Sequence, residues 1–171
     1  QQQDNPGEAY KLNLEAATAF AALEAWPDLV TVLDNLGSTM ADQSIKFYAQ
    51  AYWLALHVAV PIEQSLSLAT KLTGYVERQV APLLAVSASH LVNRMGEDNP
   101  RQEALLQICV DLLVTSADSL GVQEDEFADW FSREGLDRQN HVLPTLRRVL
   151  CQLAGGSWIF DREALLRYSV N

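Results

Sequence analysis

The stretch FYAQAYWLALHVAVPI, residues 47–62, carries no formal charge, although the chain as a whole is acidic. A second uncharged stretch, QVAPLLAVSASHLVN, follows at 79–93. Helix-forming segments that are apolar on nearly every side belong to a protein core or to a membrane. Each stretch is shorter than the roughly 20 apolar residues of a membrane span and contains Gln, His and Pro. We therefore expect both to form buried core helices and not membrane segments.

Helix start and stop signals recur on both sides of these stretches, and alternation with a period of two residues is absent. Asn5 and Pro6 form a cap-plus-proline start, and Asn99 and Pro100 repeat it. Helices are predicted over 6–26, 27–36, 39–60, 61–73, 75–95, 100–120, 123–134, 142–153 and after Asp161.

Individual residues predict how several of these helices begin, bend and end. Gly37 is expected as a left-handed cap, with Ser38 or Thr39 capping the following helix. Pro82 is expected to kink or divide its helix, because its ring removes a backbone donor. Asp161 is expected as an N-cap. The helix at 100–120 has a clear apolar face, expected to point inward and formed by Leu105, Ile108, Cys109, Leu112 and Leu113.

The loops between these helices are short, so consecutive helices should pack antiparallel. The predicted fold is all-α: one domain over residues 1–171, an irregular bundle of eight to nine mostly antiparallel helices. Its core should come from 39–60, 61–73, 75–95 and 100–120, while residues 1–5 form a flexible tail. The pattern does not distinguish an irregular bundle from a short stack of helical hairpins.

The charge is acidic and unevenly distributed. The chain has 12 basic and 22 acidic residues, a net charge of −10. Residues 133–171 form the only net-positive region, with six arginines at 133, 138, 147, 148, 162 and 167. Acidity argues against nucleic-acid binding and against an anionic membrane surface. The basic region is expected to dock on the acidic body of its own fold or of a second copy, or to form a small anion site.

The two cysteines, Cys109 and Cys151, lie on apolar helix faces and are expected as buried, unlinked thiols. The sequence begins QQQDNPGEAY, which has no basic region before an apolar core, so a cytoplasmic location is predicted. A processed precursor remains an alternative.

Catalytic and metal-binding patterns are absent. His57, His90 and His141 have neither a carboxylate nor another histidine at helical spacing. No phosphate-binding glycine loop and no nucleophile elbow occurs. We therefore predict no catalytic residue, no metal and no cofactor.

The segment EDEFADWFSREG, residues 124–135, is both acidic and aromatic. Phe127, Trp130 and Phe131 are expected on one side of a short helix, and the acids, among them Asp125 and Asp129, on the other. Such a helix could bind in a partner's groove, and these five residues are the candidate partner-binding site. The alternative is that the aromatic triplet anchors the helix to its own core.

Three functional hypotheses follow. The first is a non-catalytic interaction protein, an adaptor or chaperone. No catalytic pattern is present in the sequence, and its four tryptophans are more than the predicted core requires. The second is an acidic inhibitor or immunity protein that blocks a basic enzyme surface. The third is an enzyme whose site combines scattered residues, with His57, His90 and Tyr52 as first candidates. All three hypotheses leave open whether the chain also binds a second copy of itself.

Overall fold

The computed structural model describes residues 6–95 and 99–168, without side-chain placement for Pro6 and Tyr168. The chain is 76% helical and all-α, an α-helical bundle as predicted. The predicted tail at 1–5 and the residues Gly96, Glu97 and Asp98 lie outside the described residues. The backbone contacts divide the chain into two compact units, unit 1 (Gln1–Pro61 and Leu150–Asn171) and unit 2 (Ile62–Val149). The single domain stays a prediction.

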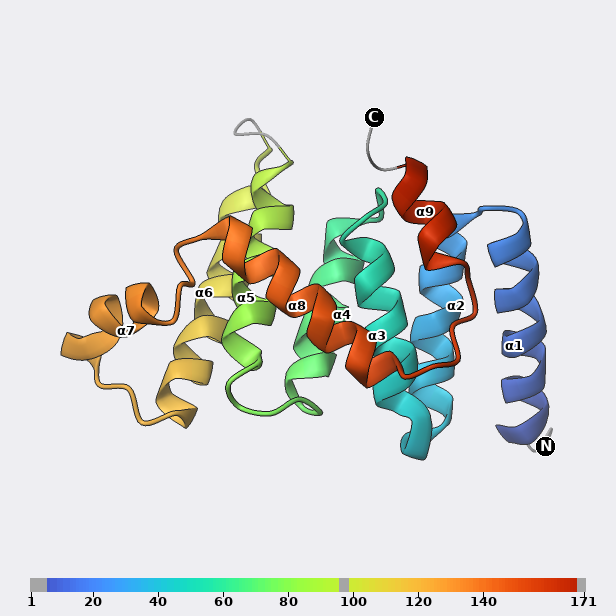
Figure 1. Cartoon of the computed structure of the whole chain (residues 1–171), viewed down its shortest axis with the longest axis horizontal. Helices are drawn as coiled ribbons and strands as arrows, with labels where there is room; N and C mark the ends of the chain where they lie inside the picture. The colour runs from blue at the N-terminus through green and yellow to red at the C-terminus, as the bar shows by residue number, and fades with distance from the viewer. Residues whose placement is uncertain (1–5, 96–98, 169–171) are drawn as a thin grey trace. The chain divides into compact units, whose positions relative to one another are not determined.

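Unit 1 contains α1 (Pro6–Ala22), α2 (Trp26–Thr39), the 3₁₀ turn η1 (Ala41–Gln43), α3 (Ser44–Ala55) and α9 (Arg162–Tyr168). The helix α2 packs against both α1 and α3, and the three run alternately up and down in Figure 1. Nearly all of α3 is buried, including the polar side chain of Gln50. The first uncharged stretch is therefore core where it is helical, as expected.

Gln50 connects α3 to a distant part of unit 1 through two hydrogen bonds. Its Nε2 donates to the carbonyl of Ser157 at 3.0 Å, and its Oε1 accepts the backbone N–H of Ile159 at 3.1 Å. A buried amide is stable only when its donors and acceptors find partners. Gln50 therefore fixes the segment that leads into α9.

The predicted cap of α9 is present. The Oδ1 atom of Asp161 accepts the backbone N–H groups of Glu163 and Ala164 at 2.9 and 3.0 Å. Phe160 and Leu165 are both buried, as a hydrophobic staple requires.

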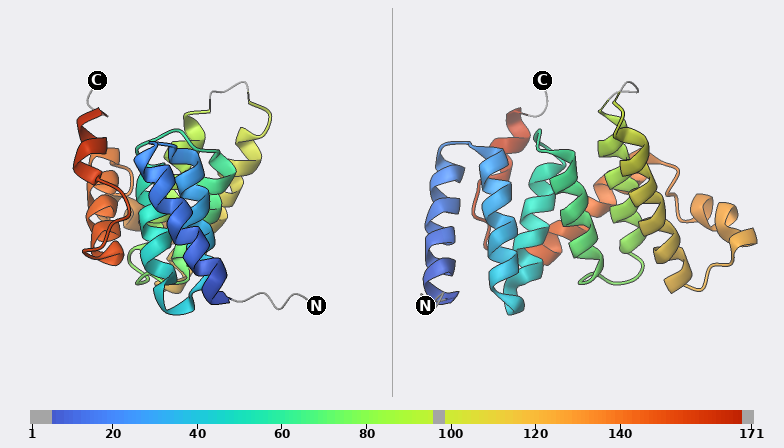
Figure 2. Two further views of the ribbon diagram at one scale, coloured as in Figure 1. Left: turned by 90° about the vertical axis from the view of Figure 1, so that its right-hand side faces the viewer. Right: turned by 180° about the vertical axis from the view of Figure 1, so that it is seen from behind.

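Unit 2 contains α4 (Ile62–Thr73), α5 (Ala81–Asn93), α6 (Gln102–Ser119), the 3₁₀ turn η2 (Glu124–Glu126) and α7 (Phe127–Arg133). The helix α5 packs against α4 and α6, and Figure 2 shows the three side by side. The helix α8 (Gln139–Ala154) begins in unit 2, and its last five residues belong to unit 1.

Several predicted helix boundaries are wrong. Pro82 lies in the first turn of α5, where its missing N–H costs nothing, so α5 starts at Ala81 and is not kinked. The helix α3 ends at Ala55 instead of Val60. Val60 precedes Pro61 and is biased toward extended backbone, which explains only why the helix does not include Val60. The helix α8 starts at Gln139 instead of Val142.

Gly37 is not a cap, because α2 continues through it to Thr39. A Cβ at this position would lie 2.5 Å from Cε1 of Tyr48 on α3, so the glycine permits a close approach between α2 and α3. Ser38 and Thr39 do not cap α3 either. Their hydroxyls donate back to the carbonyls of Asp34 and Asn35 within α2.

The apolar face of α6 is less buried than predicted. Leu105 and Cys109 are buried, whereas Ile108 is 44% exposed and Leu112 and Leu113 are half-buried. The helix α2 lies outside the predicted core segments but contributes to the core of unit 1, and its buried side chains include Leu29, Leu33 and Leu36.

Candidate functional site

The predicted partner-binding residues lie in unit 2, on η2 and α7. The segment is bounded by Gly121 and Gly135, whose φ angles of 76° and 69° lie in the left-handed region that glycine adopts without strain. Its N-terminal acids, Glu124, Asp125 and Glu126, are exposed, as is Asp129. Acidic side chains at this end of a helix interact favourably with its dipole.

The aromatic triplet of α7 is turned toward the protein. Trp130 is only 4% exposed, while Phe127 and Phe131 are half-buried. Ring centroids lie 5.4 Å apart for Phe127–Trp130 and 6.0 Å apart for Phe127–Phe131. The structure thus brings the three aromatic residues together, with Trp130 as an anchor of α7, and leaves Asp125 and Asp129 in solvent.

Each of the three aromatic side chains lines a different cavity of unit 2. Phe127 lines one of about 480 Å³ with Val114 and Val122 of the α6–α7 corner. Phe131 lines one of about 300 Å³, here called the His90 cavity. Trp130 lines a third, of about 480 Å³, here called the Trp130 cavity.

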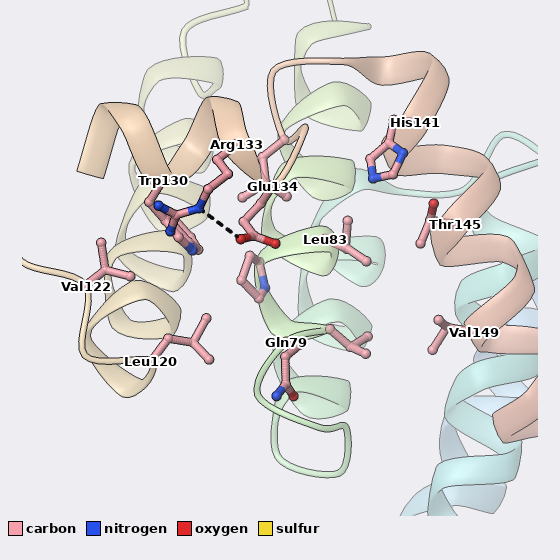
Figure 3. Close-up of a pocket in the computed structure, with 13 residues that line it drawn as sticks. Gln79, Leu83, Leu120, Val122, Trp130, Arg133, Glu134, His141, Thr145 and Val149 are labelled. Carbon is pink, nitrogen blue, oxygen red and sulfur yellow. Dashed lines mark ion pairs between the residues drawn. The ribbon is translucent and has the colours of Figure 1, made fainter. Parts of the chain in front are cut away.

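The Trp130 cavity combines three stretches of unit 2 (Figure 3). The residues at 79–83 precede and begin α5, those at 120–136 surround α7, and those at 141–149 lie on α8. Its wall is mainly apolar and comprises Val80, Pro82, Leu83, Leu120, Val122, Trp130, Leu136 and Val149. Cavities of this size and character are typical binding sites.

Polar groups lie among this apolar wall. Gln79, His141 and Thr145 line the cavity, and so do Arg133 and Glu134, which form an exposed ion pair with 3.6 Å between Nε and Oε1 (Figure 3). Between residues 118 and 137 the sequence has seven acidic residues and a single basic one, Arg133. The segment that carries α7 is therefore anionic, although the two charged residues that line the cavity, Arg133 and Glu134, pair with each other.

The His90 cavity brings together residue types that could suggest catalysis. It is lined by Ser89, His90, Cys109 and Asp137 among apolar residues. Burial raises the pKa of the Cys109 thiol to about 11, and burial followed by the charge of Arg94 lowers the pKa of His90 below 6.5. The thiol is thus protonated and the imidazole neutral at neutral pH, which is the opposite of an activated thiolate–imidazolium pair.

His57 lines a cavity of about 560 Å³ in unit 1, here called the His57 cavity, together with Glu24 and Asp161. Its Nδ1 lies 2.7 Å from the carbonyl of Trp53, and the two rings stack at 3.9 Å. Because a carbonyl only accepts hydrogen bonds, Nδ1 carries a proton. Tyr52 is completely buried and lines none of these cavities.

The four tryptophans are used by the fold. Trp53 and Trp130 are buried, and Trp26 and Trp158 are half-buried, each making an edge contact with Phe160 at 6.4 and 5.3 Å. The aromatic excess that suggested an interaction surface is therefore largely internal packing.

Among residues 6–95 and 99–168, no three side chains of His, Cys, Asp or Glu come together in a way that could hold a metal ion. Over the same ranges, no single helix has the length and hydropathy to cross a membrane. The helix α6 and the segment Glu124–Arg133 pass that test together by length and composition, with a bend of 110° between them.

Sequence reasoning found Trp130 but missed the residues opposite it, above all Leu83, Thr145 and Val149. The four-residue spacing of Thr145 and Val149 was the available signal, because it places both on one face of α8. No protein-family model, no curated protein and no solved structure matches this chain.

Proposed function

We propose that the protein is a non-catalytic protein–protein interaction module of the adaptor or chaperone type. The observation that carries this proposal is the Trp130 cavity, a mainly apolar depression of about 480 Å³ beside an anionic helix. The preferred ligand is a peptide segment with a large apolar side chain next to Lys or Arg.

The physical basis is a division of roles between the wall and the rim. Burial of an apolar ligand side chain against Leu83 and Trp130 contributes most of the affinity, at roughly 25 cal/mol per Å² removed from water. The exposed carboxylates of Asp125 and Asp129 act at longer range and favour encounter with a basic segment. Salt should therefore weaken binding without abolishing it.

Two alternative functions stay open, each because of one observation. The acidic residues of 118–137 would equally suit an inhibitor that covers a basic enzyme surface, in which case charge and not the cavity would dominate. The His57 cavity, which also contains Glu24 and Asp161, is the feature that an enzymatic function would use.

The test is selection of a random displayed peptide library on the intact protein. Trp130→Ala is a poor probe, because truncating a buried tryptophan costs about 3–5 kcal/mol of stability. Thr145→Arg instead places a long charged side chain at the half-buried edge of the cavity. Thr115→Arg is the matched control, since Thr115 is exposed on α6 and lines none of the described cavities.

We expect selection of peptides with an apolar residue flanked by Lys or Arg. Their affinity should fall at least about tenfold in Thr145→Arg and stay unchanged in Thr115→Arg. If no peptide is enriched, or if Thr145→Arg binds as well as the parent, the proposal is wrong. Peptides that respond only to Asp125→Asn and Asp129→Asn would favour the inhibitor.

A further inference from the structure

The His57 cavity is formed by four segments of unit 1. It is lined by the end of α1 with the turn that follows it, by Trp26 at the start of α2, by residues 57 and 58 after α3, and by the start of α9. Its volume of about 560 Å³ falls within the range of small-molecule sites. The residue types in its lining indicate what kind of molecule it suits.

The charged residues that line this cavity are both acidic. Glu24 and Asp161 are exposed carboxylates, and no lysine or arginine among residues 6–95 and 99–168 is part of the lining. Arg162, which follows Asp161, is engaged elsewhere in unit 1. One of its guanidinium nitrogens lies 2.9 Å from Sγ of Cys151, and its Cζ lies 4.4 Å from the ring centroid of Trp158. The two carboxylates give the cavity a negative potential, which favours a cation over an anion.

The rest of the wall is aromatic and aliphatic. Trp26 is half-buried and makes an edge contact with Phe160 at 6.4 Å between ring centroids, which limits its movement. His57 is held in a similar way by stacking on Trp53. An indole ring attracts cations, and aliphatic groups can cover the hydrocarbon part of an organic cation. The aliphatic lining consists of Ala21, Ala22, Val58, Ala164 and Leu165.

This combination suits an organic cation better than a metal ion. A hard ion such as Ca²⁺ takes about six to eight oxygen ligands, whereas the cavity offers two carboxylates among hydrocarbon groups. An ammonium group has three hydrogen-bond donors and needs fewer partners. Its hydrocarbon chain also gains from contact with an apolar wall.

Glu24 has a backbone conformation that glycine would adopt more readily. Its φ of 53° lies in the left-handed region, at the position after a helix that glycine usually occupies. The N–H of Glu24 donates to the carbonyl of Ala21 at 3.2 Å, and the N–H of Ala25 donates to that of Phe20 at 3.0 Å. Backbone strain of this kind is concentrated at functional sites, and here it holds a carboxylate at the cavity.

We infer that the His57 cavity binds an organic cation, an ammonium group on a short hydrocarbon chain, either as a free amine or as a lysine side chain. Glu24 and Asp161 provide the negative charge, Trp26 provides the aromatic surface, and the aliphatic wall covers the chain. This site lies in unit 1 and does not depend on the Trp130 cavity, which lies in unit 2.

The test is an NMR titration of the intact protein with butylammonium chloride at constant pH and ionic strength. We expect saturable shifts of the His57 ring and of the Trp26 indole, while the signals of His141 and Trp130 in unit 2 stay unchanged. Butanol has a similar chain without the charge and should bind at least about fivefold more weakly. Butyrate carries the opposite charge and should not bind.

Two substitutions remove one carboxylate each and preserve the local structure. Asp161→Asn keeps an N-cap of similar quality, and Glu24→Gln keeps the length of the side chain. Each should weaken butylammonium binding about threefold, as expected for the loss of an exposed ion pair. Glu8→Gln is the matched control and should bind normally, because Glu8 is exposed on α1 and lines none of the described cavities.

Glu24→Gly separates binding from folding. Glycine relieves the left-handed backbone, so the midpoint of unfolding in urea should rise. Butylammonium binding should nevertheless weaken as it does in Glu24→Gln. A loss of binding in a variant more stable than wild type cannot result from misfolding.

Any of three results would overturn the inference: a response to butanol as strong as that to butylammonium, unchanged binding in both Glu24→Gln and Asp161→Asn, or an equal loss in Glu8→Gln. A further arm distinguishes the two sources of the ammonium group. If Nα-acetyl-lysine methylamide binds more tightly than butylammonium, the ligand is a lysine side chain, and if it binds equally or more weakly, the ligand is a free amine.

Discussion

Cys109 and Cys151 have different surroundings, although both were predicted as buried thiols on apolar helix faces. Cys109 is 2% exposed, and burial raises its pKa to about 11. Cys151 is half-buried, and its Sγ lies 2.9 Å from a guanidinium nitrogen of Arg162. Arg162 is 11 residues from Cys151 in sequence and is brought near it only by the fold.

This difference predicts the order in which the two thiols react. At pH 8, a thiol with a pKa of about 11 is ionised in roughly one molecule per thousand, and burial further restricts access to it. We expect iodoacetamide to alkylate Cys151 at least about tenfold faster than Cys109, as followed by peptide mass spectrometry. Unfolding in urea should remove the difference and serves as the control. Equal rates in the native protein would contradict the prediction.

Single residues were predictable where their role depends on the nearest few positions. Asp161 caps α9 because its side chain needs only the next two or three amides. Phe127, Trp130 and Phe131 share one side because of helical spacing alone. The depth of Trp130 depends on α5 and α8, and no local pattern contains that information.

At the scale of helices, the contact between α2 and α3 depends on Gly37. The ring of Tyr48 occupies the space that a side chain would need, with three ring atoms 2.5–2.9 Å from an added Cβ. Tyr48 is 5% exposed, and its hydroxyl lies 3.1 Å from that of Ser38 on α2. The ring is held at both ends and cannot move aside freely.

Gly37→Ala should therefore destabilise the protein. Alanine in a helix interior ordinarily gains about 1 kcal/mol over glycine, but overpacking a close contact costs about 1–3 kcal/mol and should outweigh that gain. The measurement is the free energy of unfolding in urea. Gly156→Ala is the control, since an added Cβ there meets nothing within 4 Å. A stability equal to or above that of wild type would show that α2 and α3 can separate without cost.

Helix identity was predicted more reliably than helix ends. The existence of α3, α5 and α6 follows from long apolar patterns that tolerate errors of several residues. Their ends depend on competing local signals at Ser38, Pro61 and Pro82. A proline can start a helix or break one, and which outcome holds depends on packing beyond the neighbouring residues.

At the scale of the whole chain, the all-α class was predictable from composition and periodicity. The division into two units was not, because unit 1 combines residues 1–61 with residues 150–171. The Trp130 cavity was not predictable for the same reason, since its wall comes from three separate stretches of unit 2.

We expect the chain to unfold in one transition. The helix α8 continues without interruption through the boundary between residues 149 and 150, and helix formation is cooperative. Trp130 is the sole tryptophan of unit 2, whereas Trp26, Trp53 and Trp158 belong to unit 1. Trp130→Phe therefore leaves fluorescence that reports on unit 1 alone.

The measurement compares four unfolding midpoints in urea: the fluorescence and circular dichroism midpoints of Trp130→Phe, and the same two midpoints of the triple Phe variant at 26, 53 and 158. Coincident midpoints within each variant support a single cooperative domain. A fluorescence midpoint that departs from the circular dichroism midpoint of the same variant would show that the units unfold separately.

Gln50 has a consequence for the order of events during synthesis. Its two hydrogen-bond partners, Ser157 and Ile159, emerge from the ribosome more than 100 residues later. Until then the amide must stay hydrated, and α3 cannot reach its final environment, whereas residues 62–149 are already complete. The N-terminal helices are thus made first and completed last, so a nascent chain arrested before residue 157 would expose a segment that the finished protein keeps hidden.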